Sequence, residues 1–399
     1  MESHYPQNGN QNRPNIFEHE IQFDRPNFNN SSSSQPINFN AENIKSEDNS
    51  KNIGYNFDNP QENQQNNPDF NSRNVTQGNS FVKEYVSDVN LYGLSIQNNP
   101  NTLRIAVSSL ETSTTQNKIE IVELSKTTEK LTKVSMESTL FPQSKINWCP
   151  SSNNNNLLAA TSDNLRIYKY NETNSKLSLT LDMNKKKKNS GPITSMDWNR
   201  INPNLIGVCS VDTTCTIWDL TKQDIKTHLI AHDKEVFDIS FGANENTFIS
   251  TGADGSIRLF DLRALDTCSV IFESLDQTPI NRIKWNCIDD HYIAATVQDK
   301  NIVYIIDARV MNSPYACLTY HSNLVNEIAW APNSWSHICT VGDDKNSLIW
   351  DISMIENKSD EPIASYKSEN EIENCQWSEP HEEWIAINSN NMLKLLKVI

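Results

Sequence analysis

The sequence predicts an all-β fold, a seven-bladed β-propeller, preceded by a disordered Asn-rich tail. First, a hydrophobic residue stands two positions before an aromatic residue at six places, and these anchor pairs recur every 43 to 50 residues. Second, each recurrence contains short β-type runs separated by polar turns, and four strands in about 45 residues is the period of a propeller blade. Third, the composition changes near residue 80, because all nine Trp and all eight Cys of the 399-residue chain follow that point.

Residues 1–79 form the predicted tail, which is rich in Asn, Gln and Ser, as in NNSSSSQPINFN and PQENQQNNPD. Such a segment buries too little apolar surface to offset the conformational entropy that folding removes. We therefore expect disorder over residues 1–79 and a folded domain over residues 80–399. Compositional drift explains the tail better than a prion-like role, which stays an alternative.

The ring is predicted to close with a strand from the start of the domain. Residues 80–88, SFVKEYVSD, have the pattern of a strand but belong to no blade of their own. The last unit provides only three strands, near residues 374–377, 384–388 and 392–399. We expect residues 80–88 to supply its fourth strand, which removes an exposed sheet edge.

Seven units follow this strand in order. The first (DVNLYGLSIQ, TLRIAVSSL, NKIEIVELS) lacks the Trp and is the weakest. The other six carry the anchor pair, whose spacing of two places both side chains on one face of a strand. In the fourth unit the later runs are TFIST and IRLFDL, joined by the turn GADGS, in which Gly tolerates the positive φ of a hairpin. The six pairs are Ile146 with Trp148, Met196 with Trp198, Ile239 with Phe241, Ile283 with Trp285, Ile328 with Trp330, and Cys375 with Trp377.

Polar residues recur at fixed offsets within three units and resemble the WD40 repeat. In that repeat a His, a Ser or Thr, an Asp and a Trp form one hydrogen-bonded network. An Asp stands six residues before an aromatic residue, and in two units a His stands nine residues before the anchor aromatic. The sixth blade carries His321, Thr340, Asp344 and Trp350; the fourth carries His232, Ser250 and Asp254, with Phe260 in place of the indole donor; the third carries Asp212 and Trp218, with Val208 on the middle strand.

These polar sets are interpreted as structural rather than catalytic. A hydrolase has one catalytic triad in its active site, whereas these polar residues recur at the same offsets from blade to blade. The sequence has no GxSxG elbow, no HExxH motif, no Gly-rich phosphate loop and no His/Cys cluster with metal spacing. We therefore expect no catalytic residue, no metal ion and no cofactor.

Charge and cysteine usage limit the partners. A net charge of −16 opposes a surface for nucleic-acid phosphates. The basic run Lys185–Lys188 is interpreted as a solvated loop, with a nuclear-import patch as the alternative. The sequence has no run of 18 apolar residues and no apolar signal region, so we expect neither a membrane span nor a secretory signal. Without a CxxC pair, Cys209 and Cys215 are expected to be reduced core residues rather than a disulfide.

Four stretches resemble one family more closely than the generic repeat. Residues 203–220, 227–241, 251–263 and 328–352 resemble the WD repeat-containing protein 68 family, also named as a cullin-4-associated factor, with plant Transparent Testa Glabra relatives. The resemblance covers about residues 81–399 and is looser in the first two blades. It implies a non-enzymatic scaffold in nucleus and cytoplasm. Animal members dock dual-specificity tyrosine-regulated and homeodomain-interacting kinases, and plant members hold MYB and basic helix-loop-helix transcription factors.

An alternative function follows from a second resemblance. FDLR and IDAR each place an Arg two residues after an Asp, like the WDxR element of WD40 substrate receptors for cullin-4 ubiquitin ligases, although Trp is absent from the first position. The residues concerned are Asp261, Arg263, Asp307 and Arg309. The competing interpretation pairs each Arg with a neighbouring blade.

The main predicted function is that of a monomeric adaptor that presents protein partners such as kinases or transcription regulators. The loops holding His232 and Asp254 lie at the same end of a blade, and a basic rim there would suit an acidic or phosphorylated partner. Arg263 and Arg309 should lie on the opposite face, giving two separable surfaces. Phe237 has an alternative role as a core residue. The side chains expected to be ready for contact on the first face are Lys234, Phe237, Arg282, Asn326 and Lys345.

Overall fold

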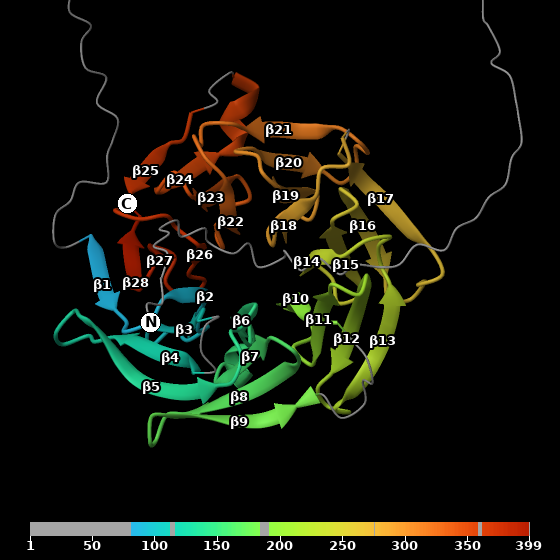
Figure 1. Cartoon of the computed structure of the whole chain (residues 1–399). Helices are drawn as coiled ribbons and strands as arrows, with labels where there is room; N and C mark the ends of the chain where they lie inside the picture. The colour runs from blue at the N-terminus through green and yellow to red at the C-terminus, as the bar shows by residue number, and fades with distance from the viewer. Residues whose placement is uncertain (1–80, 112–115, 184–190, 275, 358–360, 399) are drawn as a thin grey trace, which may run out of the picture. The chain divides into compact units, whose positions relative to one another are not determined.

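The computed structural model describes residues 81–398 apart from 112–115, 184–190, 275 and 358–360. The predicted tail over residues 1–79 and the Lys185–Lys188 run lie outside the described residues. In the described part, 28 strands form seven four-stranded antiparallel sheets around a common centre (Figure 1). This confirms the all-β, seven-bladed propeller predicted from the sequence.

Each blade has four strands, here named a to d from the ring centre outward (Figure 1). In blades 1 to 3 these strands follow one another along the chain. They are β2 (Leu91–Ile96), β3 (Arg104–Ser109), β4 (Asn117–Leu124) and β5 (Leu131–Thr139) in blade 1; β6 (Lys145–Trp148), β7 (Leu157–Thr161), β8 (Leu165–Asn171) and β9 (Lys176–Asp182) in blade 2; and β10 (Ile193–Trp198), β11 (Leu205–Ser210), β12 (Thr214–Asp219) and β13 (Asp224–Ile230) in blade 3.

Blades 4 to 6 repeat this order. Their strands are β14 (Val236–Phe241), β15 (Thr247–Gly252), β16 (Ser256–Asp261) and β17 (Cys268–Glu273); β18 (Ile280–Trp285), β19 (Tyr292–Val297), β20 (Val303–Asp307) and β21 (Pro314–Leu318); and β22 (Val325–Trp330), β23 (His337–Gly342), β24 (Asn346–Asp351) and β25 (Ala364–Lys367). Short 3-10 helices cover Ser152–Asn154 and Ile352–Asn357. Across the described chain, no helix is both long and apolar enough to cross a lipid bilayer.

Blade 7 joins the two ends of the domain. Strands β26 (Asn374–Trp377), β27 (Trp384–Ser389) and β28 (Met392–Lys397) are completed by β1 (Val82–Val86). Strand β1 runs antiparallel to β28, with Val82 opposite Leu396 and Val86 opposite Met392. Its residues fall within the segment 80–88 that the sequence assigns to this role. The ring is therefore held shut by pairing between its first and last strands.

The hydrophobic core consists of layers between neighbouring blades rather than one central mass. One cluster joins Leu205 and Ile217 of blade 3 to Ile239 and Phe248 of blade 4, and comparable clusters lie at the other blade junctions. Inner strands are packed on both faces, which explains why runs such as LIGVCS in β11 are apolar throughout. Cys209 lies opposite Cys215 within such a layer, and both are free thiols. Each blade is thus fixed by two neighbours.

Candidate functional site

The antiparallel strands give the propeller two distinct loop faces. Loops that precede strand a and turns that join strands b and c lie at one end of each blade; we call this the His face, after residues 231–235, 253–255, 319–324 and 343–345. The loops that join a to b and c to d lie at the other end. We call that end the DxR face, after residues 262–267 and 308–313. The two sets of predicted interface residues can therefore be placed on separate faces.

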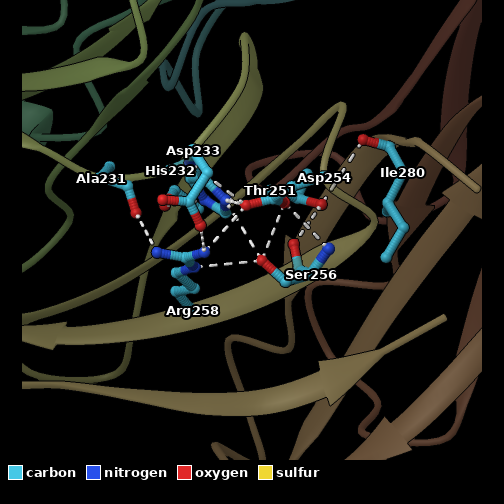
Figure 2. Close-up of polar contacts among 9 residues, drawn as sticks. Ala231, His232, Asp233, Thr251, Asp254, Ser256, Arg258 and Ile280 are labelled. Atoms are coloured by element: carbon cyan, nitrogen blue, oxygen red, sulfur yellow. Dashed lines mark hydrogen bonds and ion pairs between the residues drawn. The ribbon is translucent and has the colours of Figure 1, made fainter. Parts of the chain in front are cut away.

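In blade 4 the predicted polar residues meet under the His face. His232 Nδ1 lies 2.9 and 3.0 Å from the Asp254 carboxylate oxygens, and its Nε2 lies 2.8 Å from Ser250 Oγ. Figure 2 shows Arg258 and Ser256 converging on the same carboxylate, with Arg258 Nη2 3.0 Å and Ser256 Oγ 2.8 Å from its oxygens. Arg258 was missed in the sequence, because it lies outside the pattern of His, Ser or Thr, Asp and Trp. Its counterpart in blade 2 is Arg166, which binds the turn residue Asp163 at 2.7 Å.

In blade 6 the four predicted residues form one chain of hydrogen bonds. His321 Nδ1 lies 2.9 Å from Asp344 Oδ2, and its Nε2 lies 2.7 Å from Thr340 Oγ1. Trp350 Nε1 donates to the same Thr340 oxygen at 2.9 Å. Burial alone would raise the pKa of Asp344, but the hydrogen bond from His321 and its charge outweigh burial and lower that pKa to about 2. The carboxylate is thus ionised and fixed in place.

Blade 3 has only part of this arrangement. Asp212 accepts hydrogen bonds from the Gly191 amide at 3.1 Å and from the Thr214 hydroxyl at 2.5 Å. Trp218 Nε1 is buried and has no hydrogen-bond partner within the described residues. The reason is that Val208, with no side-chain acceptor, occupies the strand position that Thr340 holds in blade 6. Within the described residues, the network of blade 3 is thus incomplete because its middle strand supplies no hydroxyl to Trp218.

The geometry of these networks points to a structural rather than a catalytic role. The His232 side chain and the Ser250 residue are fully buried, and each His nitrogen already has a partner. The same holds for His321 and Thr340. A nucleophile needs access to a substrate as well as a base, and these hydroxyls have none. Together with the fold, this arrangement points to a non-catalytic protein.

Two of the five side chains predicted to be ready for contact on the His face are engaged internally. Arg282 donates to Tyr92 Oη at 2.9 Å and lies 3.6 Å from Glu327 Oε2, with 17% of its side chain exposed. Asn326 Nδ2 donates to Asp343 Oδ1 at 2.8 Å and to the Ile372 carbonyl at 2.9 Å. The prediction that these two residues are unmatched is wrong. Arg282 is bound by residues of blades 1 and 6, and Asn326 is bound within blade 6 and by the loop that precedes β26.

The other three residues differ in exposure. Lys234 and Lys345 are exposed, and Lys345 Nζ donates to the Glu369 carbonyl at 3.0 Å. Phe237 is half-buried at a bulge, where the register of β14 shifts between Val236 and Asp238. The bulge explains why Phe237 falls out of phase with the buried Ile239. Lys234 and Lys345 are thus exposed, with Lys345 also bonded within the protein, and Phe237 is half-buried.

In the described loops of the His face, exposed acidic side chains outnumber exposed basic ones, against the basic rim expected from the sequence. Asp233 and Asp276 have 84% and 82% of their side chains exposed. The described loops of this face add further exposed acids, whereas their exposed cations are Lys234 and Lys345. These further acids are Asp88, Asp163, Glu235, Asp299 and Glu369. The sequence suggested the opposite because the lysines were counted without the acids beside them in space.

The Arg residues of the DxR face are exposed and paired with their own Asp. Arg263 Nη2 lies 2.6 Å from Asp261 Oδ2, and Arg309 Nη2 lies 2.6 Å from Asp307 Oδ2, with Nε donating at 2.9 Å in both cases. The Arg side chains are 69% and 57% exposed. Neither guanidinium forms an ion pair with a neighbouring blade in the described structure, which removes the competing interpretation. Adjacent blades 4 and 5 thus present the same Asp–Arg fork on one face.

Known proteins resemble both the repeat and the whole domain. A family model described as "WD domain, G-beta repeat" matches residues 183–219 and 223–261. A chain from the COPII outer coat vertex on membranes has the same fold, with a TM-score of 0.66 at 15% identity, over 78% of this chain and 85% of that chain. An uncharacterized WD repeat-containing protein of Schizosaccharomyces pombe is 37% identical over 252 residues, which are 56% of this chain and 58% of that protein.

One relative matches across nearly its entire length. The DDB1- and CUL4-associated factor 7 homolog of Dictyostelium discoideum is 40% identical over 321 residues, which cover 79% of this chain and 98% of that protein. The chain therefore belongs to the WD repeat family of the DDB1- and CUL4-associated factor 7 homolog.

Proposed function

We propose that this protein is an adaptor that holds kinases or transcription regulators against the loops of its His face, in the nucleus and the cytoplasm. The match to the DDB1- and CUL4-associated factor 7 homolog over 98% of its length carries this proposal. The resemblance to plant Transparent Testa Glabra relatives supports transcription factors as one class of partner. The function requires binding surfaces and no chemistry, in agreement with the buried His networks.

Rigid presentation is the proposed mechanism. Each blade is locked by apolar layers on both sides, and the polar networks fix the turns that reach the His face. Loops on such a scaffold lose little conformational freedom when a partner binds, so less of the interaction energy is spent on ordering them. Several partners can then share one propeller without large rearrangement of it.

The exposed acids of the described His-face loops favour a partner segment with basic residues. Asp233 and Asp276 extend into solvent from blades 4 and 5. Opposite charge across an interface raises association rates and excludes like-charged competitors. A segment rich in Arg or Lys therefore suits this face better than a phosphorylated one.

A pair of charge-reversal variants tests this proposal. Asp233→Lys with Asp276→Lys should weaken capture of a kinase or transcription-factor partner in pull-down from native cells at least tenfold. The matched control, Glu245→Lys with Asp266→Lys, makes the same charge change at exposed positions of the DxR face and should leave that capture unchanged. Melting curves must agree among all three proteins. Equal loss in both double variants would contradict the His face as the binding surface.

A second candidate function, that of a substrate receptor for a cullin-4 ubiquitin ligase, is favoured by the two exposed Asp–Arg forks. They lie at equivalent positions of adjacent blades, and the relative's name associates it with DDB1 and CUL4. Arg forks suit recognition of planar acceptors on a partner. The absence of Trp before either fork is the departure from the WDxR element.

The forks can be tested separately from the His face. Arg263→Ala with Arg309→Ala should abolish any pull-down of the cullin-4 adaptor and spare the kinase or transcription-factor partner. Lys126→Ala with Lys222→Ala, two exposed cations on the same side of blades 1 and 3, is the control. An adaptor that binds the fork variant as well as wild type would remove this second function and leave the first intact.

A further inference from the structure

A cavity of about 380 Å³ lies on the propeller axis, between the inner strands and the loops of the DxR face. Its side walls come from residues next to the anchor positions of strand a, including Lys145, Asp197 and Lys284. Its mouth is formed by a–b loops, where Arg200 of blade 3 forms an ion pair with Glu379 of blade 7. Cavities of a few hundred Å³ are large enough for a small metabolite.

A layer of charged side chains crosses the axis on the His-face side of this cavity. Lys145 of blade 2 has its Nζ 3.5 Å from Glu327 of blade 6 and 4.0 Å from Asp238 of blade 4. Arg282 of blade 5 binds Glu327 and reaches across to Tyr92 of blade 1. The four charges in this layer, Lys145, Arg282, Asp238 and Glu327, balance one another.

The next layer, which faces the cavity, follows a different rule. In four blades the residue after the first anchor accepts a hydrogen bond from the backbone of the next blade, and this ties the inner strands together. The contacts are Trp148 N to Ser95 Oγ at 3.0 Å, Phe241 N to Asp197 Oδ2 at 2.7 Å, Trp285 N to Ser240 Oγ at 3.2 Å, and Ile96 N to Gln376 Oε1 at 2.7 Å.

Lys284 breaks this rule in blade 5. An ammonium group donates hydrogen bonds and cannot accept one, so Lys284 cannot tie blade 5 to the Trp330 amide. No carboxylate among the described residues lies within ion-pair distance of its Nζ, unlike that of Lys145. Burial, and next the charge of Lys145, lower the pKa of Lys284, against the attraction of the carboxylates of Glu327, Asp238 and Asp197. The cavity therefore contains an ammonium group that no carboxylate of the described residues contacts directly.

We propose that the axial cavity binds a small hydroxylated oxyanion, of the phosphate-ester class, whose anionic oxygens accept hydrogen bonds from Lys284. An ammonium group that no carboxylate contacts directly gains charge-assisted hydrogen bonds when an oxyanion binds beside it. Asp197 Oδ2 accepts a hydrogen bond from Phe241 N. Its other carboxylate oxygen suits a hydroxyl donor on the same ligand. Arg200 stands at the mouth with 49% of its side chain exposed, where it can contact the anion as it enters.

Thermal unfolding of the full chain with sodium phosphate or glycerol 3-phosphate tests this site. Sodium chloride at equal ionic strength is the reference. Both probes should raise the melting temperature in a saturable manner, by about 3–6 °C at saturation, with glycerol 3-phosphate acting at lower concentration because of its hydroxyl groups. A wild-type protein that neither probe stabilises beyond chloride would overturn the proposal.

Variants then assign the effect to Lys284. Lys284→Met should lose the response to both probes, and in chloride it should melt at or above the wild-type temperature because a buried cation is gone. Lys300→Met, in a turn of the same blade on the His face, should keep the full response. If Lys284→Met does not fold, Lys284→Gln serves in its place. An undiminished phosphate response in either Lys284 variant would refute the site.

Discussion

At the scale of single residues, one strand position decides how a blade holds its Trp. Thr340 in blade 6 accepts from Trp350 and also binds His321, whereas Val208 leaves Trp218 Nε1 without a partner in the described chain. A buried indole donor without an acceptor costs roughly 1–3 kcal/mol. Blade 3 therefore carries a defect that blade 6 lacks.

Val208→Thr should repair part of that defect. A buried Val→Thr change normally costs about 1–3 kcal/mol because the hydroxyl loses water, but here Trp218 Nε1 can donate to it. We expect the variant to stay within about 0.5 kcal/mol of wild type. Val107→Thr, at an equally buried position of β3, should show the full cost in urea unfolding. Equal costs at the two positions would show that Trp218 does not reach the new hydroxyl.

Asp344→Ala should lower the free energy of unfolding by about 1–3 kcal/mol, because His321 and the Asn346 amide lose their acceptor. Partner binding should fall only as far as the fold is lost. Chemical denaturation beside pull-down measures both effects. A fully stable Asp344→Ala protein that loses one partner would show that Asp344 contacts that partner.

Acid should weaken the protein through the same carboxylates. The folded pKa of Asp344 is about 2, below its ordinary value of 3.8, and the pKa of Asp254 is also lowered, against the effect of burial, by His232. A lowered folded pKa gives stability that is present above the unfolded pKa and is lost as the pH falls through the folded pKa. Urea unfolding should therefore show falling stability from about pH 4 to about pH 2, with a shallower fall for Asp344→Asn. Identical slopes for wild type and Asp344→Asn would show that Asp344 does not contribute to the loss of stability in acid.

At the scale of elements, the role of β1 in closing the ring can be tested directly by truncation. A chain that starts at residue 80 should stay monomeric and melt within a few degrees of the full chain, because residues 1–79 lack apolar patterning. A chain that starts at residue 90 lacks β1 and leaves β28 with an unpaired edge, so it should aggregate. Size-exclusion chromatography separates these outcomes, and a soluble monomer from residue 90 would show that blade 7 needs only three strands.

The element scale also shows what the sequence could and could not predict. The anchor spacing predicted the blades, and the missing fourth strand of the last unit predicted the closing strand. Both predictions were possible because strand periodicity and turn residues are local signals. The same residues did not reveal the fate of Arg282, whose partners Tyr92 and Glu327 lie in other blades. Lys284 was missed for the same reason, since its significance depends on comparison with Ser95, Asp197, Ser240 and Gln376 around the axis. Side chains that face the axis obtain their partners only when the ring is complete.

At the scale of the whole molecule, the axial layer links blades that are not neighbours in the ring: Lys145 of blade 2 lies beside Asp238 of blade 4 and Glu327 of blade 6. Lys145→Met should lower the free energy of unfolding by about 3–5 kcal/mol, because Glu327 and Asp238 keep their buried charges and lose a cation shared between them. Lys284→Met removes a neighbouring cation that has no carboxylate at ion-pair distance and should cost little. Comparison of the two variants in urea measures the contrast. Equal destabilisation would mean that the axial cations act through packing alone.

The pairing of β1 with β28 also sets the order in which a new molecule can be completed. Val82 leaves the ribosome some 300 residues ahead of Leu396, its partner. At about 5–20 residues per second, β1 waits roughly 15–60 s before β28 exists. During that time six blades can form while the first strand stays unpaired, and the seventh is assembled only after β28 has been synthesised. Chaperone occupancy during translation should therefore persist until β28 has emerged, since every shorter nascent chain keeps an unpaired strand edge.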